Sequence, residues 1–209
     1  MDGCQIDRRT RESIEGYVLE MFSVYSKIMV VRFDIGYAER VRDFVMLDDI
    51  KRDVGHLLAN TRGKPSLFQH MVGYIIKFEF GVDKGLHAHV VLFYDGQNVR
   101  KDEYLSMQVG KYWCDVITKG DGEYHSCNVN KGAKYDKCGI GMIDHTDSTK
   151  RGYLMSEVLS YLLKEKQSVA AFKKSRRVRT IVRGVMPQAR SNAGRPRLER
   201  GMATTCGPR

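Results

Sequence analysis

The sequence lacks the long apolar runs that would place it in a membrane or direct it out of the cell. No run in its 209 residues approaches the roughly 18 that a membrane-spanning helix needs. The first residues, MDGCQIDRRTRESIEGY, are polar and charged where a signal peptide would have an apolar core. We therefore expect a soluble intracellular protein without a membrane partner.

The cysteines lack the pattern of a disulfide framework or a zinc ribbon. There are five of them, an odd number, and no two have the C-x-x-C spacing of a zinc or redox motif. They are scattered along the chain as Cys4, Cys114, Cys127, Cys138 and Cys206. Free thiols in a reducing compartment fit this pattern best.

Excess charge is absent from most of the chain and is concentrated at its C-terminal end. Residues 173–209 contain 11 Lys and Arg and one acid, Glu199, which leaves 24 basic and 24 acidic residues elsewhere, out of 35 and 25 in all. We predict a globular domain over 1–172 and a flexible basic tail over 173–209 that binds a polyanion such as nucleic acid. A disordered tail that only aids solubility is the alternative. The candidate nucleic-acid contacts in the tail are Lys173, Lys174, Arg176, Arg177, Arg179, Arg183, Arg195 and Arg197.

The order of the expected elements predicts an α+β fold. Apolar periodicity indicates helices over 8–24, 37–60, 102–118 and 152–167, and strands over 28–35, 71–80, 86–96, 124–130 and 138–145. The strands over 71–80 and 86–96 are joined by GVDKG, which is typical of a hairpin. We expect a central antiparallel sheet of about five strands with helices packed mainly on one face. The other face would be free to carry a site.

The hairpin EFGVDKGLHAHVVLF contains a candidate metal site. His87 and His89 point to the same face because strand side chains alternate. A five-residue loop places Phe80 opposite Leu86, and Glu79 therefore stands opposite His87. Two imidazoles and a carboxylate on one face form a three-point platform for a divalent cation, Mn²⁺ or Mg²⁺. Ordinary surface histidines on a half-buried strand are the alternative interpretation.

The last predicted helix contains a candidate nucleophile. On a helical wheel Tyr161 lies away from the apolar flank and beside Lys164, which follows it by three residues. A tyrosine with an ordinary pKa of about 10 attacks slowly at neutral pH unless a nearby cation, here Lys164, favours its phenolate or a bound metal activates the phosphate. Tyr153 on the same helix is the competing nucleophile. The apolar flank consists of Met155, Val158, Leu159, Leu162 and Leu163.

Taken in order, these motifs resemble a known family. The strand IMVVRFDI, the E-x₇-H-x-H hairpin and the helical Y-x-x-K resemble the HUH (His-hydrophobic-His) endonucleases. With YLLKEKQ, RTIVRG and GRPR, the chain is similar over about residues 27–197 to the inovirus-type rolling-circle replication initiators. The resemblance implies an RRM-like, ferredoxin-like nuclease core.

The resemblance also implies roles for particular residues. Glu79, His87 and His89 match the metal ligands, Tyr161 matches the nucleophile and Lys164 matches the lysine that follows it. Arg32 and Asp34 match a strand motif associated with contacting origin DNA.

The implied activity is that of a nickase which cuts and rejoins single-stranded DNA at the replication origin of a phage or plasmid, in the cytoplasm of a bacterial host. Its intermediate is a 5′-phosphotyrosine. Because no G-x-x-x-x-G-K-[ST] loop occurs, unwinding would need a host helicase. A non-catalytic DNA-binding regulator and a mobilisation relaxase or transposase remain alternatives, and the oligomeric state stays open.

Overall fold

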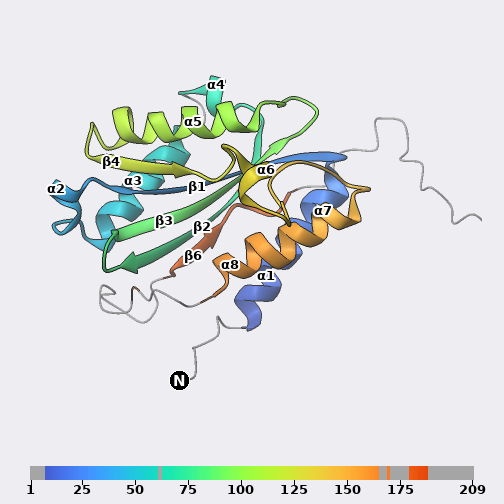
Figure 1. Cartoon of the computed structure of the whole chain (residues 1–209), viewed down its shortest axis with the longest axis horizontal. Coiled ribbons are helices and arrows are strands. Elements are labelled where there is room, and N and C mark those ends of the chain that lie inside the picture. The colour runs from blue at the N-terminus through green and yellow to red at the C-terminus, as the bar shows by residue number, and fades with distance from the viewer. Residues whose placement is uncertain (1–7, 61–62, 165–168, 170–178, 188–209) are drawn as a thin grey trace, which may run out of the picture.

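The protein is built around one antiparallel sheet (Figure 1). The computed structural model describes residues 8–60, 63–164, 169 and 179–187. The sheet has six strands in the order β4-β1-β3-β2-β6, and β5 pairs with another part of β1. The predicted α+β class and antiparallel sheet are confirmed. The strands are β1 (Lys27–Tyr37), β2 (Met71–Gly81), β3 (Gly85–Asp95), β4 (Gly122–Ser126), β5 (Gly141–Asp144) and β6 (Ile181–Arg183).

The helices include two with π-helical segments. α5 continues into the π-helical η1, and α7 continues through η2 into α8. In the part of the chain that the structure describes, no helix has the length and apolar character to cross a membrane. The bounds are α1 (Arg8–Val24), α2 (Glu39–Arg42), α3 (Leu47–Ala59), α4 (Pro65–Phe68), α5 (Asp102–Tyr112), η1 (Trp113–Ile117), α6 (Lys131–Lys134), α7 (Ser148–Tyr153), η2 (Leu154–Leu159) and α8 (Ser160–Leu162).

The single helix predicted over 37–60 is instead two helices, α2 and α3. The Asp49 carboxylate accepts a hydrogen bond from the Met46 amide at 3.0 Å, so that a new helix begins there. Between the two helices, Phe44 is 82% exposed. The apolar periodicity of residues 37–60 thus continues through a turn, and the side-chain bond of Asp49 marks where the second helix begins.

Helices lie on both faces of the sheet (Figure 1). α3, α4 and α5 pack on one face, and α1 with α7, η2 and α8 pack on the other. The second face is therefore only partly free, which corrects the expectation of an open face. Its covered half is apolar, with Ile75, Val91 and Phe93 fully buried under the helices. The polar half of the same face continues along these strands into the site.

β6 lies within the segment predicted to be a flexible tail. Ile181, Val182 and Arg183 pair with Lys77, Ile76 and Ile75 of β2, and the Phe78 amide donates to the Thr180 carbonyl at 2.7 Å. The prediction of a tail from residue 173 is therefore wrong for 181–183. Without β6, β2 would lie at the edge of the sheet with unpaired backbone N–H and C=O groups, and β6 supplies hydrogen-bond partners for them.

Candidate metal centre

The predicted hairpin register is confirmed. Glu79 is directly opposite His87, and Phe80 is opposite Leu86. Gly81 pairs with Gly85, so the loop is shorter than predicted, but the parity of the pairing is unchanged. Gly85 has a φ of 63°, a left-handed conformation that glycine adopts without strain. The turn thus fixes which residues face the site.

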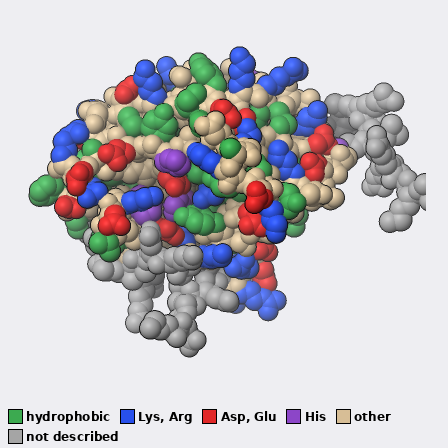
Figure 2. Space-filling model, viewed as in Figure 1, with side chains coloured by type: hydrophobic (Ala, Val, Ile, Leu, Met, Phe, Trp, Pro, Cys, Tyr) green, Lys and Arg blue, Asp and Glu red, His purple; other side chains and the backbone are tan. Residues whose placement is uncertain are grey.

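Glu79, His87 and His89 converge to form a buried cluster. Their potential ligand atoms all lie within 4.8 Å of one another. The three residues are 5%, 4% and 2% exposed. Figure 2 shows histidine side chains among acidic and basic ones on the face in view. Two imidazole nitrogens and a carboxylate oxygen are a donor set that suits a divalent transition metal such as Mn²⁺.

Hydrogen bonds orient both imidazoles. His87 donates from Nδ1 to the Gly85 carbonyl at 3.0 Å, which directs its Nε2 toward Glu79, 3.8 Å from Oε2. His89 donates from Nδ1 to Asp34 Oδ1 at 2.6 Å, and its Nε2 lies 3.0 Å from Glu79 Oε2. Carboxylates that hold the far nitrogen of a ligand histidine are typical of metal sites. Asp34, predicted to contact DNA, therefore positions a candidate ligand.

The charges within the cluster depend on burial and hydrogen bonding. Burial lowers the pKa of His87, so its imidazole is neutral. Burial also acts to lower the pKa of His89, but the bonds to Asp34 and Glu79 outweigh it and raise that pKa above its ordinary value. Burial acts to raise the pKa of Glu79, yet the bonds to His89 and Lys77 hold it below its usual range. His89 Nε2 and Glu79 Oε2 therefore lie at hydrogen-bond distance in the cluster that could hold a cation.

Lys77 is a member of the site that the sequence analysis missed. Its ammonium group contacts Glu79 Oε1 and donates to the Lys164 carbonyl, and the residue is 4% exposed. Lys77 lies two residues before Glu79 on β2, so strand parity alone would have placed it on the same face. It connects a candidate metal ligand with the end of the last helix.

Tyr161 lies beside the cluster. Its ring is 5.2 Å from the His89 ring between centroids, at 82°, and the residue is 41% exposed. The prediction that Tyr161 lies away from the apolar core is confirmed. Tyr153, the competing nucleophile, is on α7, before the π-helical segment η2.

The cation beside Tyr161 is Arg32, where the sequence analysis expected Lys164. Arg32 Cζ lies 4.5 Å from the centroid of the Tyr161 ring. α8 ends at Leu162, and Lys164 lies beyond that end with an exposed side chain. Burial and the charge of Asp34 raise the pKa of Tyr161, and Arg32 acts in the opposite direction. The phenol is therefore protonated at neutral pH.

The π-helical segment η2 changes the face that the last helix buries. Leu154 is fully buried, whereas Met155, which the helical wheel placed in the core, is half-buried. A π-helical turn has more residues than an α-helical one, so a wheel drawn at 100° per residue fails there. Val158, Leu159, Leu162 and Leu163 are buried as predicted.

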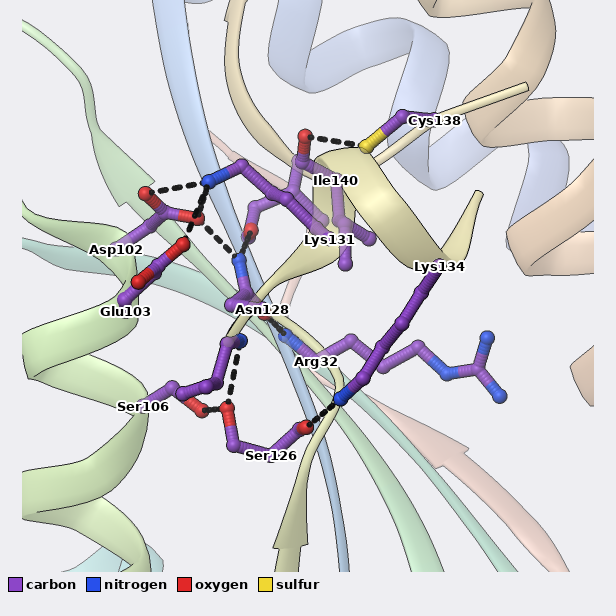
Figure 3. Close-up of polar contacts among 12 residues, drawn as sticks. Arg32, Asp102, Glu103, Ser106, Ser126, Asn128, Lys131, Lys134, Cys138 and Ile140 are labelled. Carbon is purple, nitrogen blue, oxygen red and sulfur yellow. Dashed lines mark hydrogen bonds and ion pairs between the residues drawn. The ribbon is translucent and has the colours of Figure 1, made fainter. Parts of the chain in front are cut away.

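Asn128 fixes the backbone of Arg32 (Figure 3). Its Oδ1 accepts from the Arg32 amide at 2.7 Å, and its Nδ2 donates to the Val30 carbonyl and to Asp102 Oδ2. Lys131 in turn pairs with Asp102. The strand predicted over 124–130 ends at Ser126 because, at Asn128, these side-chain bonds replace strand pairing.

Of the DNA contacts predicted in the tail, the structure describes only Arg179 and Arg183. Arg183 Nε donates to Ser13 Oγ at 3.1 Å, and its guanidinium lies over the Tyr17 ring, so it holds α1 to the sheet. Arg179 is exposed and remains a candidate contact. The other predicted contacts lie outside the described residues: Lys173, Lys174, Arg176, Arg177, Arg195 and Arg197.

A family model described as the YagK/YfjJ C-terminal domain matches residues 6–178, most of the chain. The chain belongs to this family. No curated protein and no solved structure gives a significant match. The match to the YagK/YfjJ domain includes the hairpin, Asp34 and Tyr161, and ends before β6.

Proposed function

We propose that this YagK/YfjJ domain is a metal-dependent endonuclease and ligase of single-stranded DNA that uses Tyr161 as its nucleophile. The observation that carries the proposal is the contact between the Tyr161 ring and His89, a member of the buried Glu79, His87 and His89 cluster. A phenol beside a candidate metal centre is the arrangement that phosphoryl transfer to tyrosine requires. The ordered motifs that resemble the HUH endonucleases support the same activity.

The reaction follows from these positions. Glu79, His87 and His89 would hold a divalent cation, Mn²⁺ or Mg²⁺, which would supply electron withdrawal at the scissile phosphate. Asp34 holds the His89 ring in place through Nδ1, and Lys77 holds the far oxygen of Glu79.

Tyr161 Oη attacks phosphorus and loses its proton, and the 3′ oxygen leaves and takes up a proton. The products are a 5′-phosphotyrosine and a 3′ hydroxyl. Attack by a 3′ hydroxyl on the same linkage reverses the step without ATP, because the phosphotyrosine retains the energy of the phosphodiester.

In its biological setting, the proposed enzyme starts rolling-circle replication of a phage or plasmid in the bacterial cytoplasm, where a host helicase separates the strands. The exposed Arg179 and the basic residues around it in the sequence would bind the phosphate backbone. A mobilisation relaxase or a transposase would share the same chemistry. Mapping the cleaved sequence to an origin, a transfer site or an element end separates these roles.

The test is covalent capture of DNA. The full-length protein is incubated with Mn²⁺ and a random-sequence single-stranded oligonucleotide library that has a dye at its 3′ end. We expect an adduct that survives denaturation and retains the 3′ dye, and peptide mapping should locate it at Tyr161. A library labelled at the 5′ end should release its dye, because the 5′ fragment leaves with the 3′ hydroxyl.

Variants assign the roles. Tyr161→Phe should abolish the adduct and Tyr153→Phe should not. His87→Ala with His89→Ala should also abolish it but leave salt-sensitive DNA binding, and His56→Ala on α3 is the matched control. A wild-type protein that binds DNA without forming an adduct would overturn the proposal in favour of a non-catalytic DNA-binding regulator.

A further inference from the structure

A cavity of about 450 Å³ opens beside Tyr161, on the side of Asp34 and Arg32. Its walls come from β1, from the segment between β4 and β5, and from η2 and α8. Because Asp34 and Tyr161 border both the cavity and the metal cluster, a molecule in the cavity would lie next to the reacting groups. The proposed attack of Tyr161 on phosphorus assigns no part of the substrate to this cavity.

One part of the cavity wall is apolar and aromatic. Tyr135, Cys127 and Val158 line it, and Val158 belongs to the π-helical segment η2. Burial, with the nearby Cys127, raises the pKa of Tyr135 to about 12, so its ring stays neutral. An uncharged aromatic ring beside aliphatic side chains is a surface on which a nucleobase stacks.

Arg32, on another part of the wall, has a buried hydrogen-bond donor that the described residues leave without a partner. Within the described part of the chain, the Nε of Arg32 is buried and has no hydrogen-bond partner. Buried donors are satisfied in nearly all native proteins. Because this Nε is not exposed to the cavity, the guanidinium has to turn for a ligand in the cavity to supply the missing acceptor. The guanidinium of the same residue also contacts the Tyr161 ring. In that turned position Arg32 holds an acceptor of the ligand beside the nucleophile.

The rim of the cavity has charge of both signs. Lys84 and Lys137 supply two cations in addition to Arg32, and Glu157 and Asp34 supply two carboxylates. Lys137 is exposed. A phosphate would pair with the basic side chains, because the carboxylates repel it.

We propose that this cavity binds one unpaired nucleotide of the DNA strand, next to the phosphate that Tyr161 attacks. The base lies against Tyr135 and Val158, and its phosphate is held by Arg32 and Lys137. This inference rests on the proposed nicking function and names the part of the substrate that the cavity takes. It also gives a physical reason for a single-stranded substrate, because a paired base in a duplex cannot enter the cavity.

The experiment measures binding in EDTA, where no cleavage occurs, by fluorescence anisotropy of a labelled single-stranded oligonucleotide. Tyr135→Ala should weaken binding on the order of 10-fold, as expected when one base loses its stacking partner. Tyr135→Phe, which keeps the ring, should bind like wild type. Tyr104→Ala, which removes an exposed tyrosine on α5, is the control and should also bind like wild type. Equal binding by Tyr135→Ala and wild type would overturn the proposal.

A scan of abasic oligonucleotides adds an independent measurement. Removing the base at one position should weaken binding by wild type and should have no further effect on Tyr135→Ala. Lys137→Ala, an exposed change that leaves the fold intact, should reduce the dependence of binding on salt by about one phosphate contact. A flat abasic scan with wild type would also overturn the proposal.

The two proposals fail in different ways. A wild-type adduct together with a flat abasic scan keeps the nickase and rejects the nucleotide cavity. Binding that depends on Tyr135 and on one base, without any adduct, keeps the cavity and rejects the nickase.

Discussion

Lys77 and Glu79 form an ion pair inside the protein, with side chains that are 5% and 6% exposed. The same ammonium group donates to the Lys164 carbonyl just after the helix that contains Tyr161. A buried charge that loses a partner is costly, and Lys77 shares with His89 the stabilisation of the ionised Glu79. The pair therefore joins the cluster to the nucleophile helix.

Lys77→Met should destabilise the metal-free protein by about 3 kcal/mol, because Glu79 then keeps a buried charge without its lysine. Mn²⁺ should restore part of this loss by neutralising the carboxylate. Urea unfolding in EDTA and in Mn²⁺ measures both effects. Lys111→Met, at an exposed position on α5, is the control and should change little. An equal loss with and without Mn²⁺ would show that Lys77 acts independently of the metal cluster.

Asp34→Asn should lower the affinity for Mn²⁺ by about 10-fold to 100-fold, as is usual when the carboxylate behind a ligand histidine is removed. The amide preserves the size of the side chain and its oxygen can still accept from His89 Nδ1, but it lacks the negative charge that strengthens this bond and raises the basicity of Nε2. Isothermal titration with Mn²⁺ gives the affinity. Asp144→Asn, at a partly exposed carboxylate on β5, should leave it unchanged. An unaltered affinity in Asp34→Asn would mean that the charge of Asp34 does not contribute to metal binding.

Arg32→Met should slow adduct formation on the order of 10-fold, because the guanidinium beside the ring favours the negative charge that develops on Tyr161 Oη during attack. Arg32→Lys should recover part of the rate because it keeps the charge. Single-turnover capture of the oligonucleotide gives the rate, and peptide mapping checks that Tyr161 is still the modified residue. Arg151→Met, which removes a cation that lies over Phe22 instead, is the control. If Arg32→Met reacts at the wild-type rate, Arg32 does not assist Tyr161.

Asn128→Ala should destabilise the protein by about 3 kcal/mol, because it leaves the Arg32 amide and the Val30 carbonyl without partners in a fully buried place. Thermal and urea unfolding measure the loss. Asn98→Ala, at an exposed position after β3, should have almost no effect. A small loss for Asn128→Ala would mean that water replaces the missing amide.

The parts of the site that the sequence predicts are those that local rules determine. Strand alternation and a short loop were sufficient to place Glu79 opposite His87 and to put His89 on the same face. Asp34 is opposite His89 on the neighbouring strand, but only the sheet order reveals this, because no local pattern says which strand adjoins β3. Its role as a positioning carboxylate could not be read from spacing.

Other parts depend on long-range contacts or on irregular backbone. Arg32 on β1 contacts Tyr161 on α8, and only the packing of that helix on the sheet brings them together. Helical spacing predicted Lys164 as the cation beside Tyr161, but α8 ends at Leu162. The π-helical segment moved Leu154 into the core in place of Met155. β6 has only three residues, too few to give a periodic signal, and its pairing with β2 appears only in three dimensions. Lys77 is the exception, since alternation on β2 could have revealed it.

The returning strand β6 has a consequence for the integrity of the fold. It covers β2 at Ile75, Ile76 and Lys77, directly beside the buried ion pair. Cleavage of the chain ahead of Ile181 would uncover this row of amides, admit solvent to the wall behind Glu79 and let a second copy add its own strand there. Proteolytic loss of residues 181–209 would then cause aggregation and loss of the cluster together.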